Sequence, residues 1–174
     1  MSKYCNQTLA GITLDCSNNK GGIKTVYIAN YGDVTGVEEN EGVITGITMA
    51  SGATFKAYQF RKNTGSMNST LTADETNGLN YVTTEVSLVF TKMDTAKRVE
   101  MAALSLGQLA VIVLDSNGIY WYITPDDYAS ASAGTGETGT AKGDRNAYTL
   151  TLSVENDGYP IEIAESAIAE IVAK

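Results

Sequence analysis

The chain has 174 residues, 43% of them hydrophobic and 18% charged, so it can bury about two thirds of its unfolded surface and we expect residues 1–174 to form one domain. Its 12 basic and 20 acidic residues give a net charge of −8, which argues against nucleic-acid binding as the main task, because phosphates would be repelled. The absence of histidine excludes Ser-His-Asp and Cys-His catalysis and most catalytic zinc sites.

The opening residues, Met1–Gly22, predict an N-terminal arm, because they are rich in Asn, Gly, Ser and Thr and end in a cluster of turn formers. The first residues lack the long apolar segment of a signal peptide, and no later stretch is long enough to span a bilayer. We therefore expect a chain that is cytoplasmic at synthesis. Cys5 and Cys16 are interpreted as ordinary thiols, with a disulfide between them as the alternative.

Three stretches that follow are typical of β-strands: Ile23–Ala29, Val43–Met49 and Thr54–Phe60. Residues Glu38–Gly42 are interpreted as an acidic turn, and Ala50–Ala53 as a second turn. Strands joined by short turns suggest a meander, in which each strand pairs with the next one along the chain.

The segment Arg61–Asn80 is polar and built mainly from small residues, with few large apolar side chains. Loops of this length inside a compact domain are usually functional or disordered. A weak alternation over Ser66–Thr72 keeps a third interpretation open, a long hairpin that extends from the body.

A strand and a helix are predicted in the middle of the chain. Tyr81–Phe90 alternates apolar and polar residues with the period of a half-buried strand. A helix over about residues 92–106 follows, capped by Thr91 or Asp94 and ended by Gly107. The apolar residues on one side of this helix are Ala96, Val99, Ala103 and Leu106.

A central hairpin comes next. Leu109–Leu114 is a continuous apolar run, Asp115–Gly118 has the composition of a turn, and Ile119–Ile123 is a second run of β-branched and aromatic residues. In this second run, alternation sends Tyr120 and Tyr122 to one face and Trp121 to the other. This favours packing in a core or interface, with a stacking platform for sugars or bases as the alternative.

The last fifty residues combine a flexible segment, a strand and a helix. Asp126–Arg145 has the lowest complexity in the chain and is expected to be an exposed loop. Tyr148–Val154 shows the cleanest alternation and predicts a strand. Ala164–Val172 predicts a short C-terminal helix that carries Ile168, Ile171 and Val172.

The segment Gly134–Gly139 has the spelling of a dinucleotide-binding loop. A site of that kind needs a strand before the loop and a helix that begins within it, so that the phosphates meet free backbone amides. Here a strand follows the loop instead. We interpret the segment as a flexible glycine-rich loop.

Other polar clusters give no recognisable site. Asp126 and Asp127 could hold a hard cation, or act as acid and base if another acid such as Asp144 met them, but no ligand pattern accompanies them. The charged run Lys142–Asn146 is interpreted as a solvated turn with a local ion pair. The sequence therefore predicts no catalytic, cofactor-binding or metal-binding residues, and no enzymatic activity.

Three stretches of the chain, Cys5–Thr35, Leu88–Ile123 and Gly139–Leu152, together resemble structural proteins of tailed bacteriophages and prophages of gut Bacteroidetes. Within that group the chain looks most like a tail tube protein, with another tail or neck component as the alternative. The resemblance covers most of the chain and rests on packing and turn signatures.

The resemblance implies a mainly β fold, a β-sandwich or small barrel with one flanking helix, assembled into hexameric rings that stack into a conduit for DNA. It implies that the partners are copies of the same chain, other tail proteins and DNA in transit, without specific binding, cofactors or catalytic residues. The chain would then be assembled in the host cytoplasm and reside in the virion tail.

Two hypotheses follow if the chain is such a subunit. The arm Met1–Gly22 and the segment Arg61–Asn80 would reach across subunit or ring boundaries, so that deleting Gly65–Asn77 abolishes tubes and leaves a folded monomer. The acidic charge would repel phosphate along the bore, with Glu38, Glu39 and Glu41 as the candidates because they cluster. The alternatives are a β-sandwich glycan-binding module and, last, an enzyme built on carboxylates.

Overall fold

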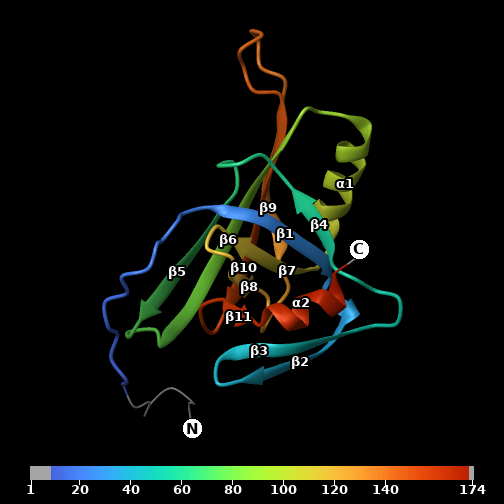
Figure 1. Ribbon diagram of the computed structural model, residues 1–174. Helices are drawn as coiled ribbons and strands as arrows, with labels where there is room; N and C mark the ends of the chain where they lie inside the picture. The colour runs from blue at the N-terminus through green and yellow to red at the C-terminus, as the bar shows by residue number, and fades with distance from the viewer. Residues whose placement is uncertain (1–8, 173–174) are drawn as a thin grey trace.

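The computed structural model describes residues 9–172, which form two β-sheets and two helices (Figure 1). The larger sheet has seven strands in the order β2-β3-β11-β8-β7-β1-β4. Their bounds are β1 Ile23–Asn30, β2 Val34–Asn40, β3 Val43–Met49, β4 Lys56–Gln59, β7 Leu109–Asp115, β8 Tyr120–Tyr122 and β11 Ile161–Ile163. A short 3-10 turn, η1, links β1 to β2 over Tyr31–Asp33.

The smaller sheet has four strands in the order β5-β6-β10-β9. Their bounds are β5 Ser66–Asp74, β6 Leu79–Thr91, β9 Ser130–Glu137 and β10 Ala147–Asn156. The helices are α1, Thr95–Leu106, and α2, Glu165–Ile171. The predicted fold class is confirmed: the described chain is mainly β, with two packed sheets, a flanking helix and a short C-terminal helix.

Strand β7 lies in the middle of the structure and is buried on both faces. Val111 and Val113 point into the core between the two sheets, whereas Ala110 and Ile112 point into a second core beneath α2. All four side chains are 0% exposed. A strand covered on both faces needs apolar residues at every position, which explains why Leu109–Leu114 reads as a continuous apolar run.

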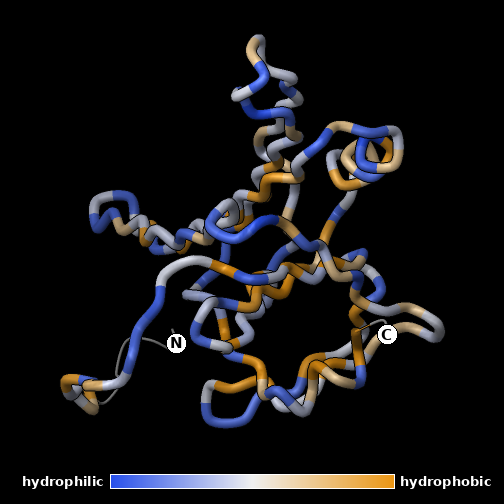
Figure 2. The backbone as a smooth tube through the Cα atoms, turned by 45° about the horizontal axis from the view of Figure 1, so that its top comes forward, coloured by the Kyte–Doolittle hydropathy of each residue, from blue (hydrophilic) through white to orange (hydrophobic). Residues whose placement is uncertain are grey.

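The core between the sheets holds most of the alternating apolar residues of the predicted strands. Val86 and Leu88 of β6 and Leu150 and Leu152 of β10 are at most 1% exposed and face β1 and β7. Figure 2 shows most of the hydrophobic segments within the body of the molecule. The strands predicted at Tyr81–Phe90 and Tyr148–Val154 are therefore confirmed.

Helix α2 covers the outer face of the seven-stranded sheet. Ile168 and Ile171 are buried there, against Phe55 and Tyr122 among others. The backbone amide of Phe55 also donates to the carbonyl of Ile171 at 2.8 Å, which ties the helix to the segment before β4. The predicted C-terminal helix, Ala164–Val172, is confirmed.

Helix α1 closes one side of the sandwich, next to β9 and β4 (Figure 1). The side chain of Asp94 accepts a hydrogen bond from the backbone amide of Lys97 at 2.8 Å, so Asp94 is the cap and Thr91 is not. The helix ends at Gly107, as predicted.

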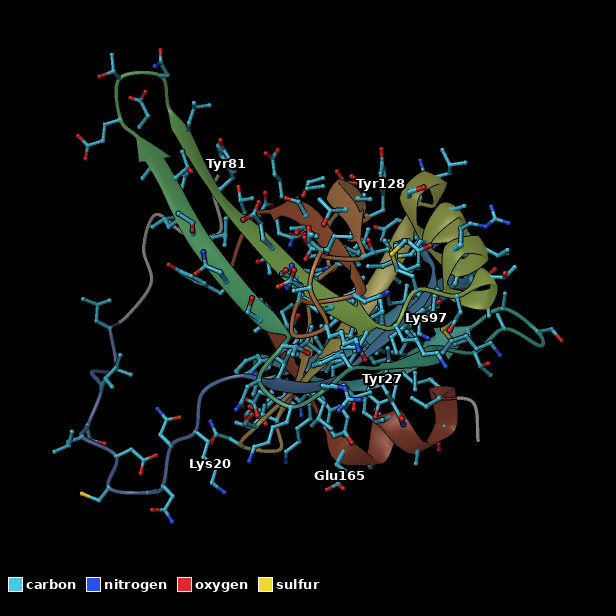
Figure 3. All side chains as sticks on the ribbon, turned by 90° about the horizontal axis from the view of Figure 1, so that it is seen from above. Lys20, Tyr27, Tyr81, Lys97, Tyr128 and Glu165 are labelled. Carbon is cyan, nitrogen blue, oxygen red and sulfur yellow. The ribbon has the colours of Figure 1, made fainter. Side chains whose placement is uncertain are left out.

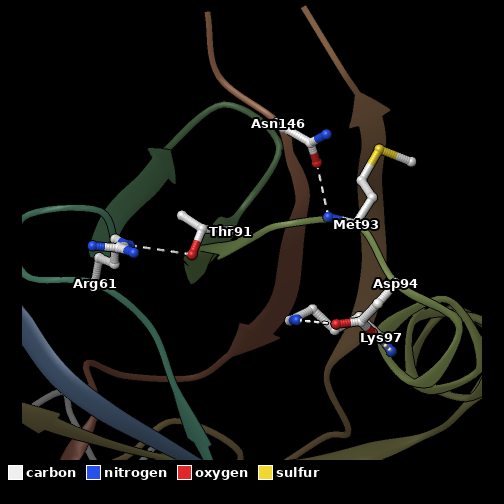
Figure 4. A network of polar contacts seen from close by, with 6 residues as sticks. All are labelled: Arg61, Thr91, Met93, Asp94, Lys97 and Asn146. Carbon is white, nitrogen blue, oxygen red and sulfur yellow. Dashed lines mark hydrogen bonds and ion pairs between the residues drawn. The ribbon is translucent and has the colours of Figure 1, made fainter. Parts of the chain in front are cut away.

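The polar contacts around the start of α1 are drawn in Figure 4. The Asn146 side chain accepts from the backbone amide of Met93 at 2.8 Å, and the Thr91 hydroxyl accepts from Nε of Arg61 at 3.3 Å. These bonds join the end of β6 to the segment after β4, and the connection that leads into α1 to the residue just before β10.

The apolar side predicted for α1 faces solvent and does not pack on the core. Its members Val99 and Leu106 are 55% and 90% exposed, whereas Leu104 is buried and Met101 packs against the core. The helix has apolar residues on two sides, and tertiary contact rather than composition selects the side that carries Met101 and Leu104.

The expected meander is also wrong. β2 and β3 do form a hairpin, but the other edge of β3 pairs with β11, and β1 lies between β4 and β7. Among the strands before residue 60, a local turn sets only the β2–β3 pairing, because β1 and β4 are separated by that hairpin and the other neighbours of β1 and β3 come from distant parts of the chain.

Two predicted loops contain strands. Glu38 and Glu39 belong to β2, and only Glu41 and Gly42 form the turn, both with positive φ, 52° and 84°. Within the expected loop Asp126–Arg145, Ser130–Glu137 forms β9, which pairs with β10. Both strands lie at sheet edges and lack the apolar alternation on which the predictions depended.

The polar segment Arg61–Asn80 forms a hairpin, the third of the interpretations left open. β5 pairs with β6 from Ser66, opposite Ser87, to Asp74, opposite Leu79. The hydroxyls of Ser69 and Thr84 share a hydrogen bond of 2.8 Å across this pair, which satisfies the fully buried Thr84. The pairing of β6 with β10 ends at Val82, so the tip of the hairpin extends beyond the sandwich.

Candidate assembly surfaces

The glycine-rich segment Gly134–Gly139 is a structural edge of the sandwich. Its first part lies in β9, and the chain then loops into β10, so no helix begins within it. A β carbon on Gly136 would lie 2.9 Å from the ring of Tyr148 and 3.2 Å from Cε of Met93. Small residues here leave space for neighbouring side chains, and the geometry of a dinucleotide site is absent.

The carboxylates considered for chemistry each hold a backbone turn. Asp126 accepts from the amide of Asp157 at 3.1 Å, and Asp127 from the amide of Tyr128 at 2.8 Å. Asp144 accepts from two amides, Thr140 at 2.7 Å and Ala141 at 2.6 Å, and these bonds lower its pKa. Within residues 9–172 no three acidic, histidine or cysteine side chains meet in a way that could hold a metal ion.

The charged run Lys142–Asn146 is a solvated turn with a local ion pair, as predicted. It lies in the exposed connection between β9 and β10, and Arg145 forms an ion pair with Glu137, its Nε donating at 2.6 Å. Asp144 is engaged with the backbone instead, so the local ion pair joins the turn to the end of β9.

The aromatic residues of β8 pack inside the protein. Tyr122 is 1% exposed in the core beneath α2, and Tyr120 lies beside Tyr27 with ring centroids 6.2 Å apart. Trp121 faces the other core, and its Nε1 donates to Asp115 at 3.1 Å. The predicted alternation is confirmed, and these residues offer no open platform to a sugar or a base.

The N-terminal arm exposes apolar side chains. In its described part Leu9, Ile12 and Leu14 are 93%, 102% and 92% exposed. The arm joins the body at Lys20, whose amide donates to Asn117 at 2.8 Å, and Figure 3 shows Lys20 where the arm meets the body. In Figure 2 the hydrophobic stretch of the arm lies apart from the other hydrophobic segments.

The outer part of the β5–β6 hairpin also exposes apolar residues. Leu71 and Leu79 are 49% and 48% exposed. Tyr81 marks this projecting part in Figure 3. The tip is held by Asp74, which accepts from the amides of Thr76 and Asn77 at 2.9 and 3.2 Å.

A third apolar surface is the outer side of α1, with Ala96, Val99, Ala103 and Leu106, all of them exposed. It lies beside the groove between α1 and β4, where the Tyr58 hydroxyl donates to Glu100. Burial and this bond raise the pKa of Tyr58. The hydrogen bond from Tyr58 to Glu100 therefore spans the groove and fixes α1 to β4, the edge strand of the larger sheet.

A cleft of about 610 Å³ opens where the arm, β1 and the end of β4 meet. Lys20, Lys24, Arg61 and Lys62 line it. The sequence analysis missed this basic cluster, because its members come from two segments that are brought together only by the pairing of β1 with β4.

The acidic cluster and the two cysteines singled out in the sequence are placed as follows. Glu38, Glu39 and Glu41 are exposed at the β2–β3 hairpin, at the opposite edge of the larger sheet from the basic cleft. Cys16 is exposed on the arm, whereas Cys5 lies outside the described residues, so their pairing stays a prediction.

Comparison with known proteins finds no family model that matches this chain, and no curated protein or solved structure similar to it. Neither helix in the described part of the chain is long and apolar enough to cross a bilayer.

Proposed function

We propose that this chain is a structural subunit that assembles with copies of itself, and that it forms the stacked rings of a phage tail tube. The observation that carries the proposal is the arm, where Leu9, Ile12 and Leu14 are each at least 92% exposed. Large apolar side chains in water are unfavourable, and a partner that covers them stabilises the assembly.

The shape of the body supports the same proposal. The outer strands β2, β4, β5 and β9 each have one neighbour in their sheets, so their other edges can take part in contacts between subunits. The projecting β5–β6 hairpin and the arm extend the reach of each subunit. Contacts that are not symmetric between subunits close into rings or propagate as filaments, and a tube of stacked rings uses both.

In this function the chain is a building block without catalytic activity, and its partners are copies of itself and other tail components. The net charge of −8 suits a conduit through which DNA passes without binding. A different tail or neck component of the virion would use the same kinds of surface, and the form of the assembly distinguishes the two.

The first experiment is negative-stain microscopy of concentrated protein, in which rings or tubes are expected. A variant with Leu9→Ser, Ile12→Ser and Leu14→Ser should lose these assemblies and unfold at the same temperature as the parent, because none of the three contributes to a core. A matched control, Thr13→Ser with Asn18→Ser, changes polar positions of the same segment and should assemble normally. Assembly that survives the three serines would contradict the role of the arm.

The hairpin needs a shorter deletion than the sequence suggested. Removing Gly65–Asn77 would take away β5 itself, together with Met67, which packs against the core. Replacing residues 72–81 by an Asn-Gly turn removes only the projecting tip, beyond the point where β10 stops pairing with β6. This variant should remain folded by circular dichroism and fail to form tubes.

Two results would overturn the proposal. One is a parent protein that stays monomeric at every concentration tested by sedimentation. The other is a soluble monomer that binds a glycan saturably, which would favour the glycan-binding module.

A further inference from the structure

Charge is divided between the two edges of the seven-stranded sheet. On the β2 side, neither residues 25–55 nor residues 146–172 contain a lysine or arginine. These ranges hold β2, β3, β11 and α2. The acidic residues of these elements and of the β2–β3 turn are Glu38, Glu39, Glu41, Glu162, Glu165 and Glu170.

The opposite edge is basic. Lys20, Lys24, Arg61 and Lys62 line the cleft of about 610 Å³. Within residues 9–172 the ion pairs are made by Lys97 and Arg145, so none of these four side chains has a carboxylate partner there.

Two acidic groups near this edge are engaged elsewhere. Asp115 precedes Ser116 of the cleft, and its carboxylate accepts from the amides of Asn117 and Ile119 and from Nε1 of Trp121. Glu100 accepts from Tyr58. Within the described part of the chain, the basic side chains of the cleft are therefore left without an ion-pair partner.

The two charged regions lie far apart on the same sheet. β2 and β4 are its outermost strands, separated by β3, β11, β8, β7 and β1. In Figure 1 the β2–β3 hairpin forms the lower end of the molecule, and β4 lies on the other side of the sheet, next to α1. Opposite charges at opposite ends can be neutralised between molecules and not within one.

We infer that the acidic β2–β3 hairpin of one copy docks into the basic cleft of the next, so that copies associate head to tail. Two β2 edges repel each other, as do two β4 edges, so pairs that join like edges are disfavoured. The contact between unlike edges is favoured, and it propagates when it is not reciprocated within one pair. The occupant is a second copy because the chain itself carries the complementary charge. This inference rests on the proposed function and gives Glu38, Glu39 and Glu41 a contact between copies in place of the bore.

The contact is tested with two charge-reversed variants. One carries Lys24→Glu and Lys62→Glu and has two acidic edges; the other carries Glu38→Lys and Glu39→Lys and has two basic edges. Arg61 is left unchanged because its side chain donates to Thr91. Each variant alone should self-associate at least about tenfold more weakly than the parent in sedimentation velocity, because like charges then meet.

Mixing the two variants supplies the decisive result. An acidic edge then meets a basic edge again, so the equimolar mixture should associate about as strongly as the parent. A control with Arg98→Glu and Lys142→Glu changes two exposed positions that belong neither to the cleft nor to the β2–β3 hairpin, and it should associate like the parent. It makes the same change in net charge as the variant with Lys24→Glu and Lys62→Glu. Association of the parent should weaken as salt rises, since the Debye length falls from roughly 8 Å at 0.15 M to 3 Å at 1 M.

The outcomes separate this inference from the proposed function. If the parent assembles and either variant alone still assembles as well, or if the mixture fails to recover, the docking inference is overturned and the assembly proposal stands. If the parent does not associate at all, both are overturned. Thermal unfolding of each variant confirms that the exposed substitutions leave the subunit folded.

Discussion

Gly65 shows how a single residue sets the approach of the β5–β6 hairpin to the body. A β carbon there would lie 2.5 Å from the ring of Phe60 and 2.9 Å from Cγ1 of Ile23, and real β carbons are not found so close to other atoms. Glycine at this point lets the chain turn from the end of β4 into β5 directly against the core.

We therefore expect Gly65→Ala to destabilise the protein by about 1–3 kcal/mol, because Phe60 and Ile23 must shift to make room. Urea unfolding measures the change. Gly32→Ala is the matched control, since nothing lies within 4 Å of a β carbon there. Equal stability of the two alanine variants would show that the protein accommodates a β carbon at Gly65 without cost. Adding Phe60→Leu to Gly65→Ala should recover part of the loss.

Small residues also decide the shape of β9, and they misled the sequence analysis. Ser, Ala and Gly in a row are typical of flexible loops, yet here they let α1 and Tyr148 pack closely against an edge strand. Composition reports how much a segment can bury. It does not show whether large side chains of a neighbouring element, such as Tyr148 or those of α1, fill the space beside the segment.

Helix α1 illustrates the same point for an element. Its position, cap and end follow from Asp94 and Gly107, which act locally, but its orientation depends on what lies beside it. Leu104 is 4% exposed and Leu106 is 90% exposed, although both are leucines two positions apart.

We expect Leu104→Ala to lower the free energy of unfolding by about 2–4 kcal/mol, because it leaves a cavity in the core between the sheets. Leu106→Ala should change it by less than about 0.5 kcal/mol, as is usual for exposed positions. Chemical denaturation of the two variants compares them directly. Equal losses would mean that the helix faces the sandwich differently.

The β5–β6 hairpin has two parts with different roles. Near the body, Met67 and the Ser69–Thr84 hydrogen bond belong to the sandwich, whereas Leu71, Leu79 and the turn lie outside it. This division makes it possible to remove the tip without removing the strand, and so to test assembly separately from folding.

The protein as a unit should be sensitive to acid. Asp94 and Asp144, together with Asp15 and Asp74, have their pKa lowered by hydrogen bonds in the folded state. A carboxyl whose folded pKa is below its unfolded value contributes stability that is fully present above the unfolded value, roughly 3.9 for Asp, and is lost as the pH falls through the folded pKa.

The midpoint of thermal unfolding should therefore be steady near neutral pH and fall as the pH drops below about 4. A variant with Asp94→Asn and Asp144→Asn should show a smaller fall over the same range, because two of the titrating groups are gone. Differential scanning calorimetry from pH 7 to pH 2 measures both. An identical pH dependence in the two proteins would show that these carboxyls do not carry the effect.

The surfaces that we propose for assembly could be anticipated only in part. The arm and the segment Arg61–Asn80 stood out as polar extensions, and their positions support that reading. The cluster of Glu38, Glu39 and Glu41 was visible too, but its basic counterpart was not. Lys24 and Lys62 are far apart in the sequence, and only the pairing of β1 with β4 places them at one cleft.

The amino-acid sequence by itself determined the local structure: the strands at Tyr81–Phe90 and Tyr148–Val154, the β7–β8 hairpin, and the C-terminal end of α1. These depend on side-chain period, capping and turn chemistry, which act over a few residues. Only the tertiary structure decided the order of the strands, the buried side of α1, the existence of β9, and the separation of acidic and basic edges. Each of these depends on contacts between distant segments, whose free energy no local pattern contains.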